Sequence, residues 1–330
     1  MKKFILHPVY SLASEGFDDR SFDYGMLPMP ICDGVTLEDV RGLLPDDAFS
    51  TWKGYLSKEE SEHLEHIRYA LVRRFDESWI PSKDRDAFEP VEAVMACLRL
   101  IRPMREHLGL VRGDIQDDGR FAVRSFSSPY SVFEVPEVEK LFSLQTEDAI
   151  RLQQLAPKLL AAYRKKRFKI TMAVEFFQAG FFETRFWKSR YSLRCSAIEA
   201  IFSSRTRRTS RISKNRIKAL LGAESCIFET GDIPSHLPQA SDITIEKVIP
   251  ELYEARNCIA HGDRIPDRFF TEYWRQGVQG SLNIMAVLDE ASSIIVRKSI
   301  LHILKNNLEE HFADSAAADA YFLPVDHQTS

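Results

Sequence analysis

The sequence lacks the patterns that mark membrane and secreted proteins. It contains no run of about 18 apolar residues that could cross a bilayer. The apolar stretch near its start is too short for a signal peptide and is interrupted by His7 and Pro8. The cysteines are scattered without a C-x-x-C pair: Cys32, Cys97, Cys195, Cys226 and Cys258. We therefore predict reduced thiols in a cytoplasmic protein, without disulfides or a zinc site.

Signatures of several enzyme classes are missing as well. No G-x-G-x-x-G, Walker, G-x-S-x-G or H-E-x-x-H pattern occurs. His63 and His66 have a spacing that two metal ligands can share on a helix, but a third and a fourth ligand are missing nearby. A solvated, charged helix face explains this pair better than a metal site. We predict no cofactor and no bound metal.

The charge is strongly uneven along the chain. Residues 1–150 contain 18 Lys and Arg against 28 Asp and Glu, a net charge of −10, whereas the remaining residues carry +6. Between Arg164 and Lys218 there are 16 basic residues and three acidic ones. Such a basic segment in an acidic protein indicates a polyanion as partner. The alternative is that a basic helical face pairs with the acidic first part.

The secondary-structure patterns change at about the same place. Short β-like pieces alternate with helical ones in the first part, where we expect helices over 57–75 and 90–107. From about Val138 the pattern is almost wholly helical, with segments near 138–163, 168–203, 211–221, 244–261, 267–287 and 289–312. We predict an α+β domain over 1–150, an all-α helical bundle over 151–313 and a poorly ordered tail over 314–330, mainly α overall.

One predicted helix combines a buried stripe with a polar edge. At about 100° per residue, Val248, Leu252, Ala255 and Ile259 form the buried stripe. The adjoining edge presents four polar side chains: Tyr253, Arg256, Asn257 and His261. Gly262 is expected to end the helix in a left-handed conformation. Arginine and histidine on one helix edge suit phosphodiester chemistry, although a helix C-terminus also favours histidine through its dipole.

These residues resemble a known family motif. The string "RNCIAHG" matches the R-x4-H signature of HEPN domains, in the form with asparagine after the arginine. The upstream "SLRCSAIEAIF", the basic "RTRRTSRISKNRIKALLG" and "IPELYEARNCIAHGD" resemble the Apea-like HEPN branch in order and spacing. The resemblance covers about residues 168–310. The HEPN variant that continues H-x-Y is disfavoured, because His261 is followed by Gly262 and Asp263.

The resemblance implies a metal-independent endoribonuclease that acts as a homodimer, with two motif helices facing a shared cleft. It implies catalytic roles for Arg256, Asn257 and His261, and a role in bacterial defence or stress, with the first domain sensing a trigger ligand or protein. The residue types suit this chemistry, because histidine transfers protons near neutral pH and arginine stabilises charge on phosphate. Two other classes stay open: a non-catalytic RNA-binding protein and a dimerisation or regulatory module.

Further residues are candidates for supporting roles. Tyr253 and Glu199 lie near the motif, where Glu199 is able to orient Arg256 or His261, or else to face solvent. Cys258 is expected to be an inert buried thiol. A basic run interleaved with serines and threonines suits phosphate contacts rather than base stacking. We predict that this run binds RNA through Arg205, Arg207, Arg208, Arg211, Lys214, Arg216 and Lys218.

Overall fold

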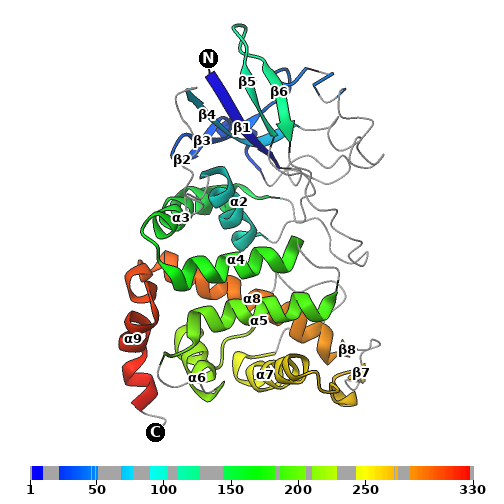
Figure 1. Cartoon of the computed structure of the whole chain (residues 1–330), viewed down its shortest axis with the longest axis vertical. Helices are drawn as coiled ribbons and strands as arrows, with labels where there is room; N and C mark the ends of the chain where they lie inside the picture. The colour runs from blue at the N-terminus through cyan, green and yellow to red at the C-terminus, as the bar shows by residue number, and fades with distance from the viewer. Residues whose placement is uncertain are drawn as a thin grey trace. The chain divides into compact units, whose positions relative to one another are not determined.

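The structure is a computed structural model of the chain (Figure 1). It describes residues 2–9, 22–45, 47–48, 50, 68–76, 90–102, 111–126, 144–182, 186–205, 210–228, 243–270, 272–273 and 282–327. Contacts divide the chain into two compact units. The first comprises Met1–Phe133 with Lys140–Lys165, and the second comprises Glu134–Glu139 with Lys166–Ser330.

The first unit is built on a six-stranded antiparallel sheet with the order β2-β3-β4-β1-β5-β6. The strands are β1 (Lys2–Pro8), β2 (Met29–Cys32), β3 (Val35–Asp39), β4 (Tyr69–Asp76), β5 (Val111–Ile115) and β6 (Phe121–Phe126). A 3₁₀ turn, η2 (Tyr24–Met26), precedes β2. Together with the helices α2 (Pro90–Ile101) and α3 (Thr146–Arg164), this sheet gives the unit the α+β character that the sequence predicts.

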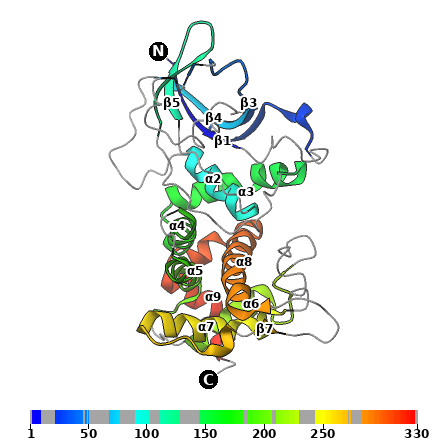
Figure 2. The same cartoon turned by 90° about the vertical axis from the view of Figure 1, so that its right-hand side faces the viewer.

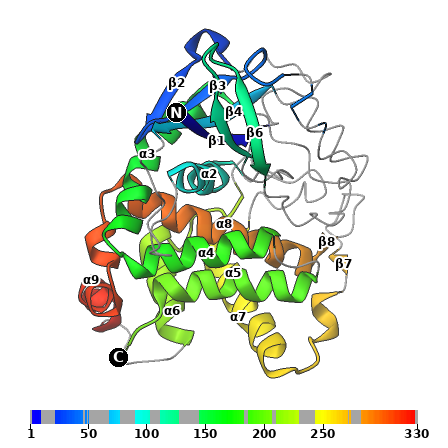
Figure 3. The same ribbon diagram turned by 45° about the horizontal axis from the view of Figure 1, so that its top comes forward.

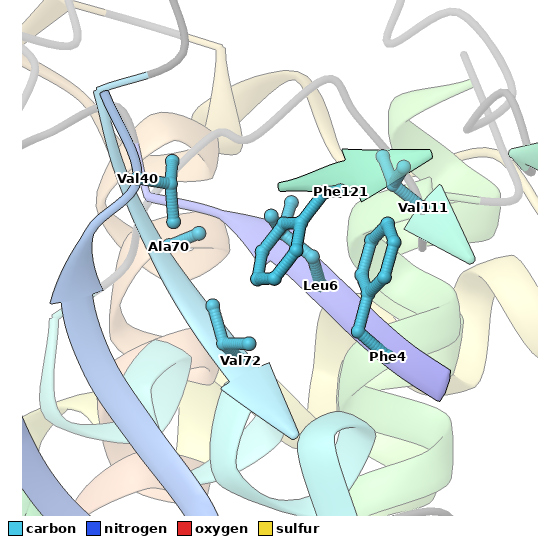
Figure 4. Packing of buried hydrophobic residues seen from close by; sticks show 7 residues of the cluster. All are labelled: Phe4, Leu6, Val40, Ala70, Val72, Val111 and Phe121. Atoms are coloured by element: carbon cyan, nitrogen blue, oxygen red, sulfur yellow. The ribbon is translucent and has the colours of Figure 1, made fainter. Parts of the chain in front are cut away.

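The two central strands are buried on both faces. In β1, Phe4 and Leu6 point to one face and Ile5 and His7 to the other, and all four are at most 5% exposed. Phe4 stacks on Phe121 with ring centroids 4.2 Å apart. Phe4, Leu6 and Phe121 belong to a core cluster whose other buried members are Val40, Ala70, Val72 and Val111 (Figure 4).

Two helices complete this unit. Helix α2 (Pro90–Ile101) contacts β1 to β4 and is buried at ten of its positions (Figure 3). Such all-round burial fits a helix enclosed between two layers, here the sheet and α3 (Thr146–Arg164). Because α3 packs on α2 and β2, the boundary between the units lies at Lys165/Lys166 rather than at the predicted 150/151.

The prediction of a helix over 57–75 is wrong for the second part of that range. Residues Tyr69–Asp76 form β4, between β3 and β1, and its first four side chains are buried. A short apolar run is compatible both with the spacing of a helix and with a strand that is buried on both faces. Hydrophobic periodicity alone therefore assigned this segment to the wrong element. The part over 57–67 lies outside the described residues.

The second unit is a bundle of six helices among the described residues (Figure 2). They are α4 (Phe168–Phe182), α5 (Trp187–Phe202), α6 (Ser210–Leu221), α7 (Ile245–His261), α8 (Ile284–Lys305) and α9 (Ser315–His327). Helices α5 and α8 contact each other, and both contact α4, α6 and α7, so these two helices form the centre of the bundle. The all-helical prediction is confirmed, but the expected helix over 168–203 is two helices, α4 and α5.

The end of the chain departs from the prediction in two places. Where the sequence predicts a helix over 267–287, the described residues before Ile284 form a 3₁₀ turn, η5 (Asp267–Phe269), and a two-residue ladder of β7 (Glu272–Tyr273) with β8 (Leu282–Asn283). From Ile284 onward the chain is helical, as part of α8. The tail over 314–330, which the sequence predicts to be poorly ordered, forms helix α9 over Ser315–His327. A 3₁₀ turn, η6 (Glu309–Phe312), precedes this helix. Phe322 of α9 is 1% exposed, because it packs against Phe202 and Phe312.

Among the described residues, no helix has the length and apolarity needed to cross a bilayer.

The C-terminal end of α5 is held by a buried lysine. Lys169 of α4 donates to the carbonyl oxygens of Ala200, Ile201 and Ser203 at 2.9–3.3 Å. These carbonyls lack helical partners and carry the negative end of the helix dipole, so an ammonium group is a favourable ligand. Burial, reinforced by the charge of Arg216, nevertheless lowers the pKa of Lys169 from 10.5 to about 8.

This lowered pKa predicts a pH-dependent contribution to stability. Between about pH 8 and 10.5 the unfolded state holds more protons at Lys169 than the folded state, so the free energy of unfolding rises with pH. We expect the difference in unfolding free energy between wild type and Lys169→Met to increase by about 1–3 kcal/mol across this window. Urea titrations at pH 7.5, 9 and 10.5 measure it, and a difference that stays flat with pH contradicts the prediction.

Candidate functional site

Helix α7 ends as the sequence predicts. Gly262 has a φ of 75°, in the left-handed region. The N–H of Gly262 donates to Ile259 O, and the N–H of Asp263 donates to Cys258 O at 2.8 Å. This pair of bonds is the Schellman arrangement, which satisfies the last carbonyls of a helix. It fixes His261 as the last helical residue, and His261 is exposed.

An ion pair joins the motif to the central helix. The Arg256 guanidinium donates from Nη2 to Glu199 Oε2 of α5 at 2.7 Å. Its Nη1 donates to the Asn257 side-chain oxygen at 3.1 Å. The side chains of Arg256 and Glu199 are 31% and 32% exposed, so the pair lies at the surface of the α5–α7 contact. Glu199 therefore orients Arg256, one of the two roles considered from the sequence.

The Arg256 guanidinium has N–H donors that a ligand is able to use. A guanidinium has five N–H groups, of which Glu199 and Asn257 engage two. The remaining ones have no partner among the described residues. Likewise, no described residue hydrogen-bonds to the His261 ring. Over five residues a helix rises about 7.5 Å, so Arg256 and His261 lie about 1.4 turns apart on α7.

Tyr253 serves the interior of the unit rather than its surface. It is 3% exposed, and burial raises the pKa of its phenol. Lys214 of α6 lies with Nζ 5.5 Å from the centroid of the Tyr253 ring. Tyr253 thus supports α7 by packing against α6, and its hydroxyl is buried rather than presented at the surface. Cys258 is half-buried, not buried as expected.

The predicted RNA-binding run needs one clear correction. Arg216 is fully buried. Its guanidinium binds Asp319 at 2.8 Å and Asp326 at 2.5 Å, and Nη1 donates to Phe202 O at 3.4 Å. Because both carboxylates belong to α9, Arg216 fastens the C-terminal helix to α5 and α6. It is a structural residue and is not available to RNA phosphates.

The other basic residues of the run differ in their exposure to solvent and in their ion pairs. Arg205 and Arg211 are exposed, and Lys214 is half-buried over Tyr253. Lys218 is ion-paired with Glu246 of α7 at 2.6 Å. Arg207 and Arg208 lie outside the described residues. The alternative, that the basic face pairs with the acidic first part, does not hold for Arg216 and Lys218, because their acidic partners lie in the second unit. It does hold for Arg164, which pairs with Asp33 at 2.5 Å.

Sequence reasoning missed the acids that brace the bundle. Asp289 of α8 accepts from Arg190 at 2.6 Å and from Arg194 at 3.0 Å, both on α5. Together with the bond from the Tyr191 hydroxyl to Leu252 O at 2.8 Å, this contact ties α5 to α7 and α8. A long-range pair of this kind leaves no periodic signal in one sequence. Among the described residues, no group of three or more His, Cys, Asp or Glu could hold a metal ion.

The burial of Arg216 gives a testable contrast with Lys218. Replacing the buried Arg216 with methionine leaves the half-buried Asp319 and Asp326 carboxylates without their cation, so we expect the free energy of unfolding to fall by about 3 kcal/mol. Lys218→Met removes a more exposed pair and should cost about 1 kcal/mol or less. Urea denaturation of both variants measures this difference. Equal, small losses would show that Arg216 is not a structural anchor.

Comparison with known proteins adds no assignment. No family model, no curated protein and no solved structure matches this chain.

Proposed function

We propose that the chain is an endoribonuclease that cleaves RNA without a metal, at Arg256, Asn257 and His261. The observation that carries this proposal is the pairing of a positioned arginine with an exposed histidine on one helix end. Glu199 holds Arg256 at 2.7 Å, while the Gly262 turn presents His261 to solvent. The R-x4-H resemblance to HEPN ribonucleases points to the same residues.

The chemistry assigns a role to each group. A neutral His261 imidazole accepts the proton of the ribose 2′-OH as its oxygen attacks the adjoining phosphorus. Arg256 donates to the non-bridging oxygens, where negative charge increases in the transition state. The bond to the 5′-oxygen then breaks, and that oxygen takes a proton. The products are a 2′,3′-cyclic phosphate and a 5′-hydroxyl.

Two protons move in this reaction, whereas the motif supplies one histidine. The imidazolium formed by the first transfer is able to return its proton to the leaving oxygen, or a second histidine acts as the acid. A homodimer that brings two α7 ends together supplies that second histidine. Glu199 and Asn257 are positioning residues in this scheme, since their contacts are to the Arg256 guanidinium.

Substitutions at the motif test the proposal. In EDTA, wild-type protein is expected to cleave single-stranded RNA or tRNA. His261→Ala should slow cleavage by about 10²–10⁴-fold, because a proton-transfer group is lost. Arg256→Ala should slow it by about 10²–10³-fold, the range for removal of a charge-stabilising donor. Glu199→Gln should give a smaller loss, since it alters only how Arg256 is held.

Arg264→Ala is the matched control. Arg264 is 84% exposed just after α7 and pairs with Asp267, so its loss should leave cleavage unchanged. Circular dichroism and sedimentation confirm that each variant folds and assembles as wild type does. Cleavage that persists in both His261→Ala and Arg256→Ala would exclude this site. RNA binding by wild type without cleavage would support the non-catalytic RNA-binding alternative.

A further inference from the structure

Exposed aromatic side chains gather at the N-terminal end of α5. Phe186 is 74% exposed and Phe270 is 45% exposed, and Trp187 is half-buried. The rings of Trp187 and Phe270 meet edge to face, with centroids 6.5 Å apart. We call Phe186, Trp187 and Phe270 the aromatic platform. Exposed aromatic clusters of this kind mark binding surfaces in soluble proteins.

Positive charge accompanies the aromatic platform. Lys188 Nζ lies 5.8 Å from the centroid of the Trp187 ring. The first turn of α5 contains no acidic residue, and the N-cap residue Phe186 provides no side-chain acceptor. The first N–H groups of this 16-residue helix therefore carry the positive end of its dipole beside the lysine. An anion with an attached flat ring matches both features.

We propose that the aromatic platform binds unstacked bases of single-stranded RNA, while Lys188 and the α5 N-terminus hold an adjoining phosphate. Bases stack on exposed aromatic rings whatever their sequence, and cations beside the rings follow the backbone. The lysine beside the rings favours a nucleic-acid partner over a protein, since aromatic residues are enriched in protein interfaces but lysine is depleted in them. The inference rests on the proposed ribonuclease function and names its substrate as single-stranded, with splayed bases.

The platform and the motif helix belong to the same helical unit and are linked through its interior. Phe270 closes the η5 turn, on the segment that follows α7 directly. Tyr191, one turn after Trp187 on α5, donates to Leu252 O of α7 at 2.8 Å. The contacts of one helix, α5, thus position both the platform, at its N-terminal end, and Arg256, which pairs with Glu199 in its last turn.

Binding of short RNA tests the proposal directly. His261→Ala serves as the background, so that RNA is not cleaved during fluorescence anisotropy with a labelled single-stranded oligonucleotide. Adding Phe186→Ala and Phe270→Ala should weaken binding by about 5-fold or more. An abasic oligonucleotide of equal length should bind both proteins equally, because it has no bases to stack. Phe168→Ala, 58% exposed on α4, is the matched control and should change neither affinity.

The outcomes separate this inference from the nuclease. Unchanged affinity in the double variant, or an equal loss with Phe168→Ala or with the abasic strand, overturns the platform even if wild type cleaves RNA. A change in oligomeric state by sedimentation velocity, with RNA affinity unchanged, identifies a protein interface instead and also overturns it. Base-dependent loss of affinity supports the platform even if wild type cleaves nothing. Absence of RNA binding in the His261→Ala background overturns the platform, whereas cleavage by wild type decides the nuclease separately.

Discussion

The helical unit depends on how the C-terminal end of α5 is satisfied. Four carbonyls there, from Ala200 to Ser203, accept hydrogen bonds from two buried cations, Lys169 and Arg216. Buried cations are costly unless they are compensated. Asp319 and Asp326 of α9 compensate Arg216, so the last helix completes a network that begins at α4. Four helices are thereby joined at one helix end.

This arrangement determines what the site is able to do. Glu199 lies in the last turn of α5, whose position the buried cations fix, and its carboxylate then fixes Arg256 on α7. The same network takes part of the basic segment out of solvent. Lys169 and Arg216 are buried and hold the fold together, whereas Arg205 and Arg211 are exposed. The net charge of the segment is therefore larger than the charge on its exposed side chains.

Local patterns predicted local features well. Gly262 ends α7 because only a residue that tolerates positive φ suits that position, and this requirement is visible in the sequence. The proximity of Glu199 to Arg256 was suggested by the motif context. In contrast, the burial of Arg216 depends on α9, more than a hundred residues away. The strand β4 was assigned to a helix because its neighbours β3 and β1, which decide its two-sided burial, are not encoded in its own periodicity.

The central claim is that α7 promotes attack by the ribose 2′-hydroxyl without a metal. The most direct measurement is end-group analysis of products formed in EDTA from an RNA oligonucleotide, beside the same strand with 2′-deoxy sugars throughout. The account predicts 2′,3′-cyclic phosphate and 5′-hydroxyl ends from the RNA and no cleavage of the deoxy strand. Products with 3′-hydroxyl and 5′-phosphate ends, or cleavage of the deoxy strand, would contradict it.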